Sequence, residues 1–146
     1  MIDVQEARGA LDRVLELTVL LGDDMARDLE RRGLTGSRAH LVWELHRLGP
    51  STQQTLAEAL GVTPRAITGL VDALTDRGFV TREPHPRDRR ATLVTFTKQG
   101  ERAAKALERD HFQLAGRLFG DMSASTFHGF TRGLDAVLAR LRELLS

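Results

Sequence analysis

One arginine and a cluster of three, near the middle of the chain, suit recognition of a polyanion. Arg65 follows Pro64 at the start of a stretch with helical periodicity, whereas Arg87, Arg89 and Arg90 occupy a short segment that also holds two prolines. A guanidinium group can pair bidentately with guanine in a major groove, or it can bind phosphates and enter a narrow minor groove. These residues predict recognition of duplex nucleic acid.

The helices that would position Arg65 lie in residues 51–78, which predict two helices joined by a tight turn. Thr52 is a good N-cap for the first helix, and Gly61 stands where a helix ends in a left-handed residue. Thr63 can cap the second helix with its side chain. Pro64 suits the first helical position that follows, so both residues predict a helix start here. The spacing is that of a helix-turn-helix motif.

The second of these helices has two unlike faces. The apolar stripe that we expect to be buried consists of Ile67, Leu70, Val71 and Leu74. The opposite, polar face consists of Arg65, Thr68, Gly69, Asp72 and Asp76. A long donor near the N-terminus and a glycine one turn later suit a helix that enters a major groove. The alternative is a helical hairpin used for packing alone.

A basic β-hairpin is predicted directly after this motif. Residues 79–83 and 91–96 are rich in β-branched and aromatic side chains, so they predict two strands with a stiff basic tip between them. Asp88 in the tip and Asp72 on the second helix are acids beside a predicted phosphate-binding surface. We hypothesise that one of these two acids orients Arg90. The alternative is a solvated basic loop.

Both ends of the chain have heptad-like apolar stripes wide enough to need a partner. The predicted dimerisation residues are Leu11, Val14, Leu21, Phe130, Leu134, Val137 and Leu141. The simplest interpretation is that the terminal helices of two chains intertwine around a two-fold axis. The alternative is that they pack on their own chain only. The expected division is 1–34 and 101–146 for dimerisation, with 35–100 for DNA binding.

Charge is spread unevenly, although the net charge is only +1 at pH 7. Residues 1–34 hold five arginines against eight acids, residues 35–100 hold nine basic residues against six acids, and residues 101–146 hold seven against six. The segments therefore carry −3, +3 and +1, so the middle of the chain is the part that suits a polyanion.

Other classes of function find little support in the residues. The chain has no cysteine, which excludes thiolate metal sites, cysteine nucleophiles and thiol switches. The five histidines have no zinc-site spacing, and there is no glycine-rich phosphate loop or G-x-S-x-G motif. No apolar run approaches the roughly 20 residues of a membrane span. We expect a cytoplasmic protein that is not an enzyme and needs no metal or cofactor.

The order of these elements resembles the multiple antibiotic resistance regulator (MarR) family. The segments that carry the resemblance are LAEALGV, TPRAITGLVDALTDRGFVTREP and DRRATLVTFTKQG, and Asp88-x-Arg90 matches the family's wing signature. The resemblance implies a mainly α fold, with about six helices, a winged helix-turn-helix and a two-stranded β-wing. It implies a homodimeric transcriptional regulator, generally a repressor, on a pseudo-palindromic operator.

The resemblance also assigns roles to individual residues. The implied DNA-binding residues are Gln53, Gln54, Thr63, Pro64, Arg65, Thr68, Arg87, Arg89 and Arg90. In this family a small phenolic or anionic ligand commonly releases the DNA. The candidate lining residues are His40, Trp43, Arg47, His111 and Phe112. A rival interpretation is a helical protein–protein adaptor that uses a winged helix without DNA.

Overall fold

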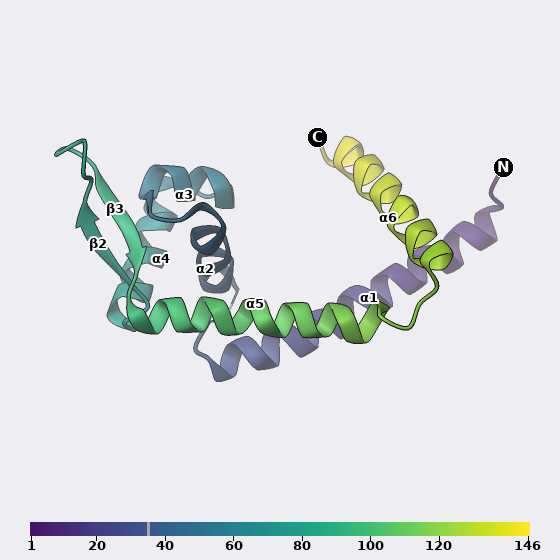
Figure 1. The fold of residues 1–146 in the computed structure, drawn as a ribbon. Helices are drawn as coiled ribbons and strands as arrows, with labels where there is room; N and C mark the ends of the chain where they lie inside the picture. The colour runs from purple at the N-terminus through teal and green to yellow at the C-terminus, as the bar shows by residue number, and fades with distance from the viewer. Residues whose placement is uncertain (35) are drawn as a thin grey trace. The chain divides into compact units, whose positions relative to one another are not determined.

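The computed structural model describes residues 1–34 and 36–146, and these form two compact units, Met1–Ala104 and Lys105–Ser146. The predicted boundary at residue 35 lies outside the described residues. The elements are α1 Val4–Arg31, α2 Ser37–Leu48, β1 Ser51–Thr52, α3 Gln53–Leu60, α4 Pro64–Asp76, β2 Val80–Pro84, β3 Thr92–Phe96, α5 Lys98–Phe119 and α6 Ala124–Leu145 (Figure 1). The predicted mainly α winged helix-turn-helix is confirmed. The division into 1–34, 35–100 and 101–146 stays a prediction.

The core of the first unit lies among α2, α3, α4 and the sheet. Its fully buried large side chains are Leu34, Leu41, Val42, Leu45, Leu56, Ile67, Val71, Leu74, Val80 and Val94. The predicted stripe of α4 is buried at three of its four positions, and Leu70 is half-buried. Burial of this stripe fixes which face of α4 turns outward, because a helix places residues three or four apart on one side.

Side-chain caps set the ends of the two motif helices, as the sequence predicted. Thr52 Oγ1 accepts a hydrogen bond from the Thr55 amide at 3.2 Å, and Thr63 Oγ1 accepts one from the Ala66 amide at 3.1 Å. Gly61 has φ 68° and ψ 34°, the left-handed conformation that ends α3. The tight turn between α3 and α4 is therefore fixed locally.

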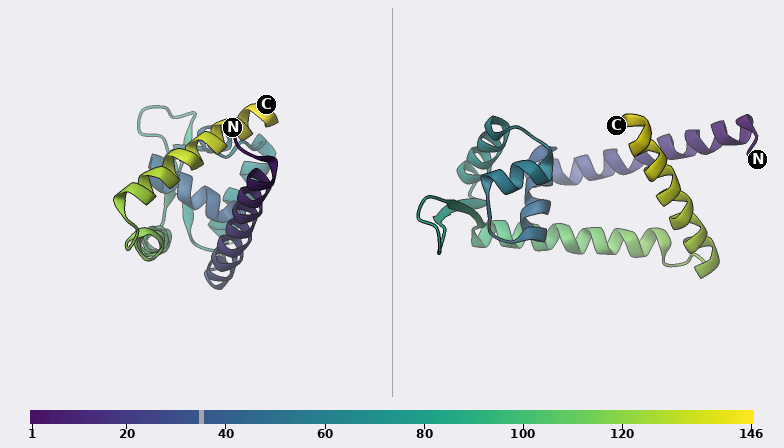
Figure 2. Two further views of the ribbon diagram at one scale, coloured as in Figure 1. Left: turned by 90° about the vertical axis from the view of Figure 1, so that its right-hand side faces the viewer. Right: turned by 90° about the horizontal axis from the view of Figure 1, so that it is seen from above.

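The expected two-stranded wing is present, and a third short strand, β1, extends its sheet. β2 and β3 form the antiparallel hairpin, but β1 also pairs with β3, giving the order β1-β3-β2. Ser51 lies opposite Val94 and is buried. A strand of two residues is too short to show an alternating pattern, so the sequence contained no periodic signal for β1. Figure 2 shows the hairpin extending away from the helices α2 to α4.

The start of α5 lies unusually close to the start of the wing. A Cβ at Gly100 would overlap the carbonyl oxygen of Phe79, and it would also lie 2.9 Å from a ring carbon of Phe96. The Thr97 hydroxyl donates to the Gly78 carbonyl and accepts from the Gly100 amide. The wing and α5 are therefore joined by backbone contact that only glycine permits at this position.

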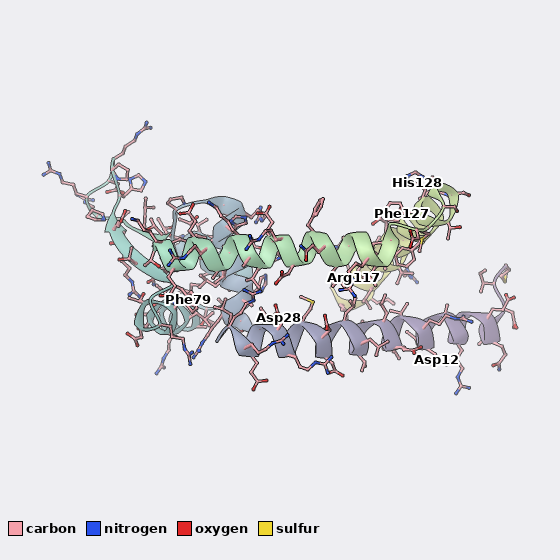
Figure 3. All side chains as sticks on the ribbon, turned by 60° about the horizontal axis from the view of Figure 1, so that its bottom comes forward. Asp12, Asp28, Phe79, Arg117, Phe127 and His128 are labelled. Carbon is pink, nitrogen blue, oxygen red and sulfur yellow. The ribbon has the colours of Figure 1, made fainter. Side chains whose placement is uncertain are left out.

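Aromatic rings close the turn between α5 and α6 in the second unit. The ring centroid of Phe119 lies 5.6 Å from that of Phe127 and 5.8 Å from that of Phe130. Ser123 caps α6 by accepting from the Thr126 amide at 3.2 Å. Phe127 also meets the ring of His128 at 5.7 Å (Figure 3).

Helices α1 and α6 bury none of their described residues within one chain. Four of the predicted dimerisation residues, Leu11, Phe130, Val137 and Leu141, are exposed, and the other three, Val14, Leu21 and Leu134, are half-buried. None of the helices in residues 1–34 and 36–146 has the length and apolar character needed to cross a membrane.

Candidate nucleic-acid interface

The outward face of α4 presents the residues that were expected to meet DNA. Thr63, Pro64, Arg65 and Thr68 are all exposed. Among the described residues Arg65 has no hydrogen-bond or ion-pair partner, so its guanidinium group can bind a ligand. Gly69, one turn after Arg65, has no atom within 4 Å of the position that a Cβ would occupy, so the backbone is open to close approach there.

Gln53 joins this helix face to the wing. Its Nε2 donates to Thr68 Oγ1 at 3.1 Å, and its Oε1 accepts from Arg82 Nε at 3.1 Å and Arg82 Nη2 at 3.0 Å. The same Arg82 Nη2 lies 2.6 Å from Asp72 Oδ1. We call these four residues the Arg82 network. It ties the first turn of α3, the face of α4 and strand β2 into one surface.

Arg82 was missed by the sequence analysis, and its position explains why. It follows Val80 by two residues on β2, so the two side chains lie on the same side of the strand. Val80 is buried, whereas Arg82 lies beyond the core and reaches the polar face of α4. A basic residue at a core-facing position near the outer end of a strand is the signal that could have identified it.

The hypothesis that one of the two acids, Asp72 or Asp88, orients Arg90 stays a prediction, and the two acids have different partners. Asp72 pairs with Arg82 and not with Arg90, because its place on α4 faces β2 rather than the hairpin tip. Asp88 does contact Arg90, but through the backbone: its Oδ1 accepts from the Arg90 amide at 3.0 Å. Asp88 therefore fixes the main chain that carries the Arg90 side chain, and the side chain itself remains open to a ligand.

Two hollows open on this surface. The first has a volume of about 480 Å³ and is lined by Thr52, Gln53, Gln54, Arg82, Arg90, Ala91, Thr92 and Val94. The second has a volume of about 530 Å³ and is lined by Gln53, Gln54, Ala57, Glu58, Gly61, Val62, Pro64, Ile67 and Thr68. The first hollow brings two arginines beside the N-terminus of α3, an arrangement that attracts phosphate. Arg87 and Arg89 lie outside it, on the exposed tip.

The candidate ligand-binding residues fall in both units. His40, Trp43 and Arg47 lie on α2, where Glu44 accepts from Arg47 Nη2 at 2.6 Å and lies 3.8 Å from His40 Nε2. Trp43 stacks on His46 with ring centroids 6.3 Å apart. His111 and Phe112 lie on the part of α5 that belongs to the second unit, and Phe112 is 80% exposed. Neither hollow includes these five residues, so their role stays a prediction.

Comparison with known proteins agrees with this geometry. The model of the MarR family matches residues 34–92. The HTH-type transcriptional regulator ML2140 of Mycobacterium leprae is 41% identical over 113 residues, which cover 75% of either chain. The HTH-type transcriptional repressor YetL of Bacillus subtilis is 31% identical over 115 residues, covering 75% of this chain and 67% of YetL.

Similarity also extends to solved structures. Streptococcus pneumoniae FabT, solved in complex with DNA, superposes with a TM-score of 0.79 at 19% identity, covering 97% of this chain and 99% of FabT. The fold and the exposed face of α4 define a helix-turn-helix transcriptional regulator. Within that class, the chain belongs to the MarR family.

Proposed function

We propose that this chain is a repressor that binds a pseudo-palindromic operator as a homodimer and releases it when a small ligand binds. The observation that carries the proposal is the Arg82 network, because it joins the exposed face of α4 and the basic wing into one surface. A surface of that kind can contact a major groove and the flanking minor groove together.

Within this proposal the two parts of the surface do different work. Arg65 and Thr68 on α4 meet base edges, where Arg65 can pair with guanine. Gln54 and Arg90, beside the first hollow, hold phosphate or the minor groove, and Arg87 and Arg89 on the tip add sequence-independent attraction. Specificity therefore comes mainly from α4, and affinity comes mainly from the wing.

The terminal helices supply the argument for a homodimer. α1 and α6 carry exposed apolar side chains along their lengths, with Leu11 56% exposed and Val137 50% exposed. Apolar stripes of this size on single helices are normally covered by a partner. A second copy of the chain is the partner that also supplies two recognition helices for the two halves of a palindrome.

Two relatives support the more specific parts of the proposal. FabT was solved in complex with DNA, and YetL is named a repressor. A repressor acts where the genomic DNA lies, so the cytoplasm remains our prediction for location.

A salt titration tests DNA binding directly. If a dimer places about six to ten basic groups on phosphates, affinity for its operator falls by about three to five decades between about 50 and 200 mM salt. The operator can first be selected from fragments of the host genome. A chain that binds no duplex at any salt concentration would instead be a protein–protein adaptor.

Ligand release has a separate test, because the chain has a single tryptophan. Phenolic and other anionic compounds should quench the fluorescence of Trp43 and lower operator affinity at the same concentrations. A panel of such compounds that changes neither signal would contradict the ligand-release part and leave DNA binding intact.

A further inference from the structure

The tip of the wing, residues 85–91, is closed by two side-chain acceptors. His85 Nδ1 accepts from the Arg87 amide at 3.0 Å and from the Asp88 amide at 3.1 Å. Asp88 Oδ1 accepts from the Arg90 amide at 3.0 Å. Backbone bonds from His85 to Ala91 and from Ala91 to Asp88 complete the loop. Most of these bonds therefore end on a side chain.

The two bonds to His85 require one particular state of its imidazole ring. A ring nitrogen that accepts hydrogen bonds must keep its lone pair, so the ring proton lies on Nε2. The imidazolium ion carries a proton on both nitrogens and accepts at neither. Protonation at Nδ1 would thus set a donor against two amide donors, and both bonds would be lost.

We propose that neutral His85 is a positioning residue for the wing tip, and that its protonation releases the tip and weakens DNA binding. This inference rests on the proposed function, since the tip carries the arginines assigned there to DNA. Because the ring accepts at Nδ1 only in its neutral form, acidification is the change that would release the tip. The tip is therefore ordered at higher pH, and this order is lost as the pH falls.

The groups around His85 allow this change to be isolated. Arg82 and Glu83 on β2 and the tip residues Arg87, Asp88, Arg89 and Arg90 are the charged side chains on the elements that flank it, and β3 has none. These charged side chains are the same in every variant compared below. The other four histidines lie on α2, α5 and α6 and are common to every variant.

The matched variants are His85→Asn and His85→Ala in the full chain. The asparagine side-chain oxygen occupies the same position along the side chain as Nδ1, accepts from amides one to three residues ahead, and cannot be protonated in this range. Alanine removes the acceptor at every pH. Both substitutions are at the tip, away from the buried core of the first unit.

Trypsin cleavage after Arg87, Arg89 and Arg90 reports tip order without any DNA. At about pH 7.5 His85→Ala should be cut at least about five times faster than the native chain, and His85→Asn within about two-fold of it. At about pH 5.5 the cleavage rate of the native chain, divided by that of His85→Asn, should rise towards the ratio found for His85→Ala. Equal cutting of native and alanine chains at pH 7.5, or a native-to-asparagine ratio constant with pH, would overturn the proposal.

Operator affinity at constant ionic strength provides the second measurement. When the pH is lowered from about 7.5 to 5.5, the operator affinity of the native chain should fall about five-fold more than that of His85→Asn. A gain relative to His85→Asn at low pH would overturn the proposal, because His85 would then act as one more cation. If no variant binds any duplex while the trypsin pattern is as expected, the proposed function fails and the role of His85 in ordering the tip stands.

Discussion

At the scale of single residues, the interface depends on side chains that meet far from one another in sequence. Gln53 and Arg82 are 29 residues apart, and Arg82 and Asp72 are ten apart. The Arg82 side chain is 33% exposed and that of Asp72 is 58% exposed. An ion pair this open to water contributes only about 0.2–1 kcal/mol to folding. Its main effect is therefore to hold geometry.

Replacing Arg82 should affect DNA binding more than stability. Arg82→Lys keeps the charge but loses the fork that bonds Gln53 and Asp72 together, so operator affinity should fall nearly as far as in Arg82→Ala. The free energy of unfolding should change by less than about 1 kcal/mol in both variants. Binding isotherms and urea denaturation measure the two effects. Full operator affinity in Arg82→Lys would mean that Arg82 acts as a point charge alone.

Arg65 and Arg89 should separate base recognition from phosphate attraction. Arg65→Ala should reduce discrimination between operator and altered sequences by about 1–3 kcal/mol, because its bidentate pairing is lost. Arg89→Ala should weaken all duplexes alike and reduce the salt slope by about one. Competition binding with base-substituted operators measures both. If Arg65→Ala lowered the affinity for every sequence equally, Arg65 would contact phosphate and not a base.

At the scale of elements, two helical glycines differ in the space around them. Gly100 in the first turn of α5 lies against the Phe79 carbonyl, whereas Gly69 on α4 has open space where a Cβ would be. Both have ordinary helical backbone, so any difference between them comes from what surrounds them.

The same substitution should therefore have opposite effects at the two sites. Gly100→Ala should lower the free energy of unfolding by about 1–3 kcal/mol or more, because the wing and α5 must separate. Gly69→Ala should raise it by about 0.5–1 kcal/mol through helix propensity, and should weaken operator binding by obstructing the groove. Thermal denaturation and binding assays measure these changes. Stronger operator binding by Gly69→Ala would remove α4 from close contact with DNA.

At the scale of the whole molecule, α1 and α6 are incomplete in a single chain. Their apolar faces are exposed, and neither helix buries a described residue. Leu141, 48% exposed, is one of the side chains whose removal from water would stabilise the proposed homodimer.

Leu141→Glu should separate the proposed dimer. Two-fold symmetry repeats the change, and each buried leucine contributes about 1.5–3 kcal/mol, so the dissociation constant should rise by at least about a hundred-fold. Sedimentation measures the state of assembly, and operator affinity should fall with it. The control Arg142→Glu places the same charge on the neighbouring exposed position and should leave the dimer intact. A native chain that sediments as a monomer would contradict the homodimer.

Local chemistry let the sequence predict much of the DNA-binding part. Thr52, Thr63 and Gly61 end or begin helices through contacts within a few residues, so their roles could be read without a fold. The apolar stripe of α4 fixed its buried face for the same reason, and with it the exposure of Arg65.

What the tertiary structure alone decided concerns pairs distant in the chain. The pairing of Ser51 with Val94 and the Arg82 network depend on how strands and helices meet, for which a one-dimensional period carries no information. Asp72 was placed on the correct face, but its partner depended on which strand lies opposite that face. The sequence by itself determined which side chains point outward, because helical and strand periods are local. Only the folded chain determined which of them meet, because that depends on contacts that close long loops.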